Sequence, residues 1–171
     1  YVITFLLPRL LGSEDQAGNY ILVIGFVSVI DNVLVTATIQ AVSKFTSQTD
    51  GVVESVKRAA LRMQLLLGGG LAVLYLAAAP WIARWERDAS LTNLYRLSTG
   101  IMLSYAFYAV FVGSLNGQRQ FGRQATLDIG FATLRGALIL GLAAAGLGVV
   151  GAIGGFVGAA ALILLASAAW V

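Results

Sequence analysis

Two ionisable residues, Asp31 and Arg135, lie within long apolar stretches of this 171-residue sequence. Asp31 is the only charged residue between positions 20 and 43, and no charged residue follows Arg135. Ionisable side chains at membrane depth are rare and usually belong to functional sites. We therefore expect both to line a cavity, where Arg135 offers a fixed positive charge to an anionic ligand. A purely structural role is the alternative for each.

Polar residues recur at every fourth position of the helix expected over residues 19–45. They are Ser28, Asn32, Thr36, Gln40 and Lys44. Steps of four keep them on one broad face, which cannot point at lipid because unpaired polar groups there are costly. We predict that Asn32, Gln40 and Lys44 line the cavity. Hydrogen bonding between helices is the alternative for Asn32 and Gln40, and it is the favoured role for Thr36 and Thr38.

Asp128 is the remaining candidate for the cavity. It shares one face of the expected helix over residues 124–145 with Gln124 and Arg135. Asp128 and Arg135 are two turns apart, which is too far for an ordinary ion pair on one helix. Asp31 and Arg135 are expected at similar depth, so the sequence predicts an ion pair between them across two helices. A pair that only fixes the packing is the alternative.

The composition indicates the kind of molecule that must hold these residues. The sequence is 58% hydrophobic and only 11% charged, with a mean hydropathy of +0.85. A soluble domain is about 25% charged, and a helix needs roughly 20 apolar residues to span a bilayer. We predict an all-α, polytopic transmembrane helix bundle with helices at about 19–45, 56–83, 91–115, 124–145 and 149–171.

Residues 1–7 are apolar but too short to span, and the last apolar run continues to the end of the sequence. We therefore expect residues 1–171 to form one transmembrane unit of a longer protein, with the end of a first helix at the start. A signal peptide is the minor alternative for residues 1–7. Ser13, with Gln16 three positions later, has the spacing of a helix cap after Pro8 and Gly12.

Basic residues outside the apolar runs favour one orientation. Lys44, Lys57, Arg58, Arg62, Arg119 and Arg123 fall on one side, against Arg9, Arg84, Arg87 and Arg96 on the other. The positive-inside rule then places the loops at 46–54 and 117–123 in the cytoplasm.

A literal match to the dinucleotide-binding glycine fingerprint occurs at residues 146–151, GLGVVG. We reject it because no strand is expected before it and no acidic residue follows it. These glycines instead predict a tight turn between two helices. The pairs Gly151/Gly155 and Gly154/Gly158 predict close helix packing, as does the run at 68–70, for which a flexible point is the alternative.

Several classes of function are not expected. The sequence has no cysteine and no histidine, which leaves no Cys or His metal site and no Ser-His or Cys-His nucleophile. Its net charge of +3 is spread over loops, so we expect no nucleic-acid partner. The close acidic pairs lie in loops beside arginines, so we expect no enzyme and no cofactor.

Four segments together resemble a known family. Residues 5–12, FLLPRLLG, precede an acidic cap and an Ala-Gly-x-Tyr sequence at 17–20. Residues 40–45, QAVSKF, resemble the end of the second helix in polysaccharide exporters. Residues 114–123, SLNGQRQFGR, resemble the short cytoplasmic loop after their fourth helix, and the glycine-rich turn with the helix at 149–171 resembles their fifth and sixth helices.

The chain thus resembles the amino-terminal half of a lipid-linked oligosaccharide flippase of the O-antigen type. That group belongs to the multidrug/oligosaccharidyl-lipid/polysaccharide exporter superfamily. The resemblance implies one lobe of a two-lobed, inverted-V transporter in the cytoplasmic membrane, working by alternating access. It implies a polyprenyl-pyrophosphate oligosaccharide as substrate, a second lobe of the same chain as partner, and a role in polysaccharide or lipopolysaccharide biosynthesis.

Two other functions remain open. A drug or cation antiporter of the same superfamily would depend on a titrating acid, so Asp31 would be essential and Arg135 dispensable. A membrane assembly protein without transport activity would tolerate polar isosteres at both positions.

Overall fold

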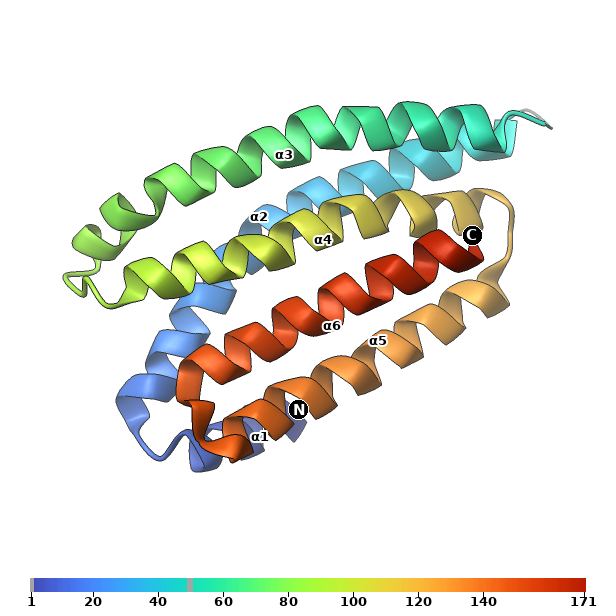
Figure 1. Ribbon diagram of the computed structural model, residues 1–171. Coiled ribbons are helices and arrows are strands. Elements are labelled where there is room, and N and C mark those ends of the chain that lie inside the picture. Colours follow the sequence, from blue (N-terminus) through green and yellow to red (C-terminus); the bar gives the residue numbers. More distant parts are fainter. Residues whose placement is uncertain (1, 49–50) are drawn as a thin grey trace.

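The computed structural model describes residues 2–48 and 51–171, and nearly all of them are helical (Figure 1). The elements in chain order are α1 (Val2–Leu11), α2 (Glu14–Gln48), α3 (Val53–Trp85), α4 (Leu91–Gly117), α5 (Phe121–Leu142), a short π-helical turn η1 (Ala143–Leu147), and α6 (Gly148–Trp170). The described residues contain no strand, and the predicted all-helical fold is confirmed for them. Tyr1, in the predicted first helix, and positions 49 and 50, in the predicted loop at 46–54, lie outside the described residues.

Four helical runs are long and apolar enough to span a membrane, which indicates a multi-pass membrane protein. Two of them are α2, with 35 residues, and α3, with 33 residues. At a rise of 1.5 Å per residue, each is about 50 Å long and exceeds the ~30 Å hydrocarbon core of a bilayer. The run over residues 121–170 reverses at Gly146, whose φ of 84° only glycine adopts without strain, so it forms the antiparallel helices α5 and α6.

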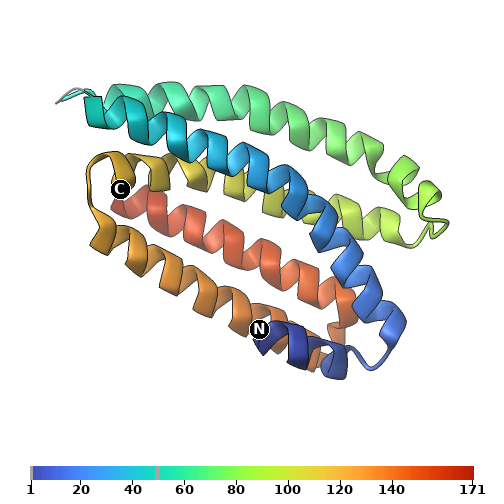
Figure 2. The same ribbon diagram turned by 180° about the vertical axis from the view of Figure 1, so that it is seen from behind.

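Helix α4 is the centre of the bundle. It packs against α2, α3 and α6, while α5 packs against α6 (Figure 2). Within the described residues, no Cα atom of α2 lies within 8 Å of one of α5, and the short α1 lies beside the start of α2 and the end of α5. The bundle therefore consists of a three-helix group, a two-helix hairpin, and a space between α2 and α5 that α4 and α6 back.

Side-chain hydrogen bonds lie at two helix starts. The Gln16 backbone N–H donates a 3.2 Å hydrogen bond to Ser13 Oγ, so the predicted cap at Ser13 is confirmed. Because the cap acts there, α2 begins at Glu14, before the predicted position 19. Before α4, the backbone N–H and the hydroxyl of Ser90 donate to Asp88 Oδ1 at 2.8 and 2.6 Å. These bonds hold the pKa of the exposed Asp88 carboxyl below its usual range.

Glycines permit the closest approach in the hairpin of α5 and α6. A Cβ on Gly155 would lie 2.5 Å from the Leu138 backbone oxygen, and a Cβ on Gly151 would lie 2.9 Å from the Leu142 oxygen. Close packing at this pair is confirmed. The prediction was wrong for Gly154, where a Cβ would meet nothing within 4 Å, and Gly158 makes only an ordinary contact, 3.7 Å from Leu138 Cδ1.

The three glycines of the run at 68–70 also differ in whether they approach a neighbouring helix closely. A Cβ on Gly68 would lie 2.9 Å from Ala106 Cβ, so Gly68 lets α3 approach α4 closely. Gly69 and Gly70 have nothing within 4 Å of that position. Close packing in the run therefore depends on Gly68 alone.

Candidate functional site

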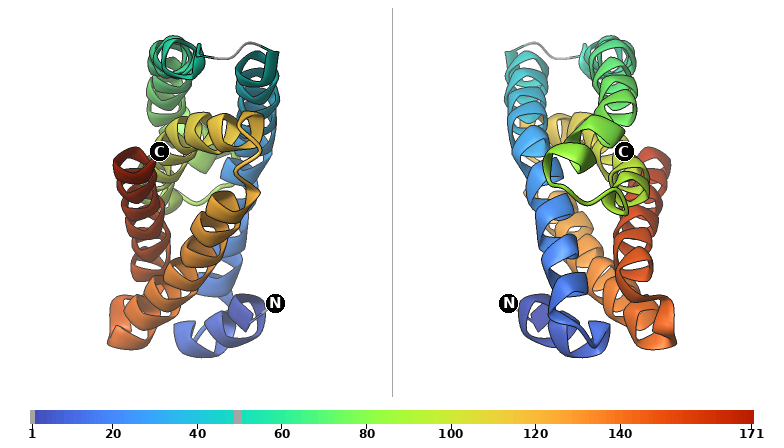
Figure 3. Two further views of the ribbon diagram at one scale, coloured as in Figure 1. Left: turned by 90° about the vertical axis from the view of Figure 1, so that its right-hand side faces the viewer. Right: turned by 90° about the vertical axis from the view of Figure 1, so that its left-hand side faces the viewer.

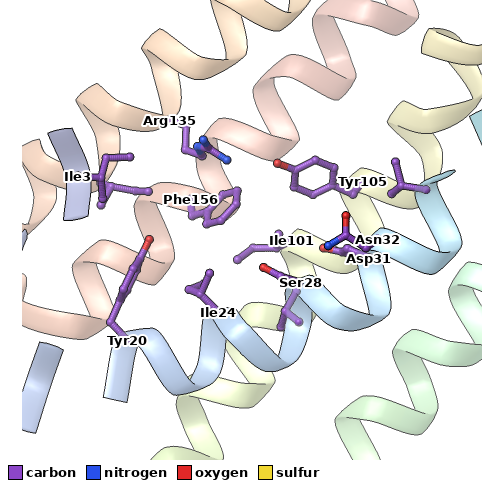
Figure 4. Close-up of a pocket in the computed structure, with 13 residues that line it drawn as sticks. Ile3, Tyr20, Ile24, Ser28, Asp31, Asn32, Ile101, Tyr105, Arg135 and Phe156 are labelled. Carbon is purple, nitrogen blue, oxygen red and sulfur yellow. The ribbon is translucent and has the colours of Figure 1, made fainter. Parts of the chain in front are cut away.

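A pocket of about 380 Å³ opens where α2 and α5 remain apart (Figure 4). Helices α2, α4, α5 and α6 contribute its walls, and Ile3 of α1 lies at one end. Its lining is mixed, with apolar side chains beside a small set of polar and aromatic ones. The latter are Tyr20, Ser28, Asp31, Asn32, Tyr105, Arg135 and Phe156.

Helical spacing explains why these side chains meet. Tyr20, Ile24, Val27 and Asp31 follow one another at intervals of three or four residues, so they form one face of α2. On α4, Ile101 and Tyr105 are four residues apart, as are Arg135 and Ile139 on α5. Each helix therefore presents one stripe to the pocket.

Arg135 is held by aromatic rings. Its guanidinium carbon lies 5.4 Å from the centre of the Phe131 ring and 5.2 Å from the centre of the Phe156 ring. Both distances allow a cation–π attraction, which is stronger where water is excluded. In Figure 4 the Tyr105 hydroxyl points toward the guanidinium. The Nε of Arg135 is buried and has no hydrogen-bond partner in the part of the chain that the structure describes.

The predicted ion pair between Asp31 and Arg135 is wrong. Both side chains line the same pocket, yet within residues 2–48 and 51–171 neither lies within 4.0 Å of an opposite charge. The physical reason is that no Cα atom of α2 comes within 8 Å of one of α5, and the aromatic rings hold Arg135 on its own side of the pocket. The pocket therefore contains a guanidinium and a carboxyl group that are not paired with each other.

Asp31 is more enclosed than Arg135. Its exposed fraction is 9%, and its Oδ1 is buried with no hydrogen-bond partner among the described residues. A charged carboxylate in such surroundings is costly without a partner. The group is therefore suited to take up a proton or a cation from the pocket.

The other predicted site residues divide into two groups. Asn32 lines the pocket next to Asp31. Gln40, Lys44 and Asp128 are exposed and lie outside it. Asp128 accepts a 3.2 Å hydrogen bond from the Tyr108 hydroxyl of α4. The structure thus brings Asp31, Asn32 and Arg135 together and leaves the remaining three apart.

Thr38 has the structural role that we predicted from the sequence, which is hydrogen bonding between helices. Its hydroxyl donates to the Leu34 carbonyl oxygen at 2.7 Å and accepts a hydrogen bond from the Gln64 side-chain amide of α3. Hydrogen bonding between helices is therefore confirmed for Thr38.

Sequence reasoning missed the aromatic members of the pocket, Tyr20, Tyr105 and Phe156. A partial signal existed for the ring next to Arg135, because Phe131 precedes it by four residues and therefore shares its face. Phe156 comes from the next helix, and its proximity depends on how closely the Gly151/Gly155 contact brings α5 and α6 together.

The site can bind and orient a charged ligand. Among the described residues, no group of three or more Asp, Glu, His or Cys side chains could hold a metal ion. A guanidinium, a carboxylate and polar oxygens at membrane depth provide recognition of an anion and of hydroxyl groups.

Comparison with known proteins found no matching family model, no matching curated protein and no matching solved structure.

Proposed function

We propose that this chain is one lobe of a transporter that moves a lipid-linked, pyrophosphate-bearing oligosaccharide across the cytoplasmic membrane by alternating access. One observation carries the proposal. Arg135 places a permanent positive charge in a pocket between membrane-spanning helices, with no carboxylate within 4.0 Å in the described part of the chain. Such a charge attracts an anion that must pass a region from which anions are otherwise excluded.

The other pocket residues suit the rest of such a substrate. Guanidinium groups bind phosphate oxygens through paired, charge-assisted hydrogen bonds. Ser28 and Asn32 offer groups that can bond sugar hydroxyls, and Tyr105 adds an aromatic face. The hydrocarbon tail would remain in the bilayer beside the bundle. A second lobe of the same protein would complete the cavity, as the resemblance implies.

The test is complementation with the complete gene in a bacterial strain that lacks its polysaccharide flippase. We expect wild type to restore surface glycan and Arg135→Ala to lose about a hundredfold or more, because a charge-assisted contact to phosphate is removed. Arg96→Ala is the matched control, since Arg96 is exposed and outside the pocket. Immunoblots of the membrane fraction verify equal amounts of each variant. Full rescue by Arg135→Ala would refute the proposal.

Asp31 supports a second candidate, a drug or cation antiporter. Its buried Oδ1 without a partner is the arrangement expected of a carboxylate that exchanges a proton for a cation. In that case Asp31→Asn would abolish drug efflux, whereas Arg135→Ala would retain it. Loss of glycan export in Arg135→Ala, with no drug efflux by wild type, would exclude this candidate.

A further inference from the structure

A second hollow, an apolar groove of about 450 Å³, lies between α2 and α3 and shares no residue with the pocket of Asp31 and Arg135. Figure 3 shows the end of α2 and the start of α3 facing each other, apart, at the top of the bundle. Small residues create the groove, because alanines occupy positions where larger side chains would fill the space. Its walls include Ala37, Ala41 and Phe45 of α2 and Ala59, Ala60 and Met63 of α3.

The groove is chemically suited to a hydrocarbon chain. Its polar residues are Thr38 and Gln64, and the amide of Gln64 donates to the Thr38 hydroxyl. Gln64 is only 4% exposed, so its amide offers little to a ligand. A ligand in the groove would therefore contact mainly methyl, methylene and aromatic carbon.

The dimensions of the groove match one leaflet of a bilayer. On α2 the lining residues extend from Leu34 to Phe45, which at 1.5 Å per residue is about 16 Å. Half of the ~30 Å hydrocarbon core is about 15 Å. The groove also lies near the ends of α2 and α3 that are adjacent in sequence.

Basic side chains flank the groove on both walls. Lys44 follows Ala41 by three residues, and Arg62 follows Ala59 by three, so each lies on the same side of its helix as a lining alanine. Both are exposed, and neither is within 4.0 Å of a carboxylate among the described residues. Their charges are thus available to an anionic group at the membrane surface.

We propose that this groove binds one acyl chain of an anionic bilayer phospholipid, whose phosphate lies between Lys44 and Arg62. The apolar lining selects the chain, the length selects a single leaflet, and the two cations select the negative headgroup. The site is independent of the proposed transport function, because it uses neither Asp31 nor Arg135.

The test uses the full-length protein in nanodiscs with equal amounts of phosphatidylglycerol and phosphatidylcholine. Lipids that remain bound after gentle detergent extraction are counted by native mass spectrometry. We expect wild type to retain phosphatidylglycerol in preference to phosphatidylcholine. Lys44→Gln and Arg62→Gln should each reduce that preference by about fivefold, as expected for one basic residue near an anionic lipid. Arg84→Gln, an exposed arginine at the other end of α3, is the control for charge.

Filling the groove tests the acyl chain separately from the headgroup. Ala59→Phe should lose the retained phosphatidylglycerol, whereas Ala77→Phe should keep it, because Ala77 is exposed on α3 outside the groove. Equal retention by these two variants, or equal retention of both lipids by wild type, would overturn the proposal. Efficient disulfide cross-linking between copies that carry Ala41→Cys would also overturn it, since a second copy would then occupy the groove.

Discussion

Arg135 has its charge beside two aromatic rings instead of beside a carboxylate. The sequence predicted the importance of this residue from its depth in an apolar segment, but it did not predict its neighbours. Ion pairing was the expected way to stabilise it, but no carboxylate in the described part of the chain lies within 4.0 Å of it. A charge held by rings keeps its hydrogen-bond donors available, whereas a carboxylate would have occupied them.

The rings make the shape of the side chain matter as well as its charge. A flat guanidinium can stack on Phe131 and Phe156 and still direct N–H groups into the pocket, whereas a lysine ammonium cannot. We expect Arg135→Lys to retain some transport but to lose about tenfold in apparent substrate affinity, a loss that follows from one weakened contact. Dose–response curves for glycan export in membrane vesicles would measure it. Export equal to wild type would show that charge alone suffices.

At the scale of the helices, hydrophobic runs and turn glycines predicted much of the architecture. The cap at Ser13 and the reversal at Gly146 could be predicted from residue type and spacing, as could close packing by glycines within residues 151–158. Which of several glycines meets a neighbour was not readable. Gly154 and Gly155 are adjacent in sequence, and only the rotation of α6 against α5 decides which of them faces inward.

This rotation gives a matched pair of substitutions. Gly155→Ala would place a methyl group against the Leu138 backbone oxygen, which cannot move aside, so we expect a loss of about 1–3 kcal/mol in stability. Gly154→Ala meets open space and should be neutral or slightly stabilising, because alanine is the better helix former. Thermal unfolding in detergent, followed by circular dichroism, measures both. Equal melting temperatures would contradict the packing of α5 on α6.

For the whole molecule, the arrangement of the helices decides which polar residues share a pocket. Asn32 and Gln40 belong to one polar stripe on α2, yet only Asn32 lines the pocket between α2 and α5. A stripe of polar residues indicates which face of its helix is polar. The extent of the cavity, however, depends on helices that are distant in sequence. For this reason Gln40, Lys44 and Asp128 could not be separated from the pocket residues by sequence alone.

The pocket should contain water, whereas the neighbouring surface should contact lipid. We expect Asn32→Cys to react with a small, charged thiol reagent and Val33→Cys to react at least about tenfold more slowly. Val33 is 72% exposed on a helix long and apolar enough to span a membrane, so we expect it to face lipid. Only the thiolate, which forms in water, is nucleophilic. The absence of cysteine from residues 1–171 simplifies the labelling. Equal labelling rates at the two positions would show that the pocket is not a distinct aqueous space.

The central position of α4 has a consequence for biosynthesis. Of the four apolar runs it is the least hydrophobic and the most enclosed by other helices. Lipid alone would retain it weakly during synthesis, so its stable insertion requires that α2 and α3, made earlier, remain nearby until it leaves the translocon. Gly113 and Gly117 let α4 pack closely against α2, so they contribute while α4 is leaving the translocon. Bulky substitutions there would reduce the number of molecules that reach the membrane.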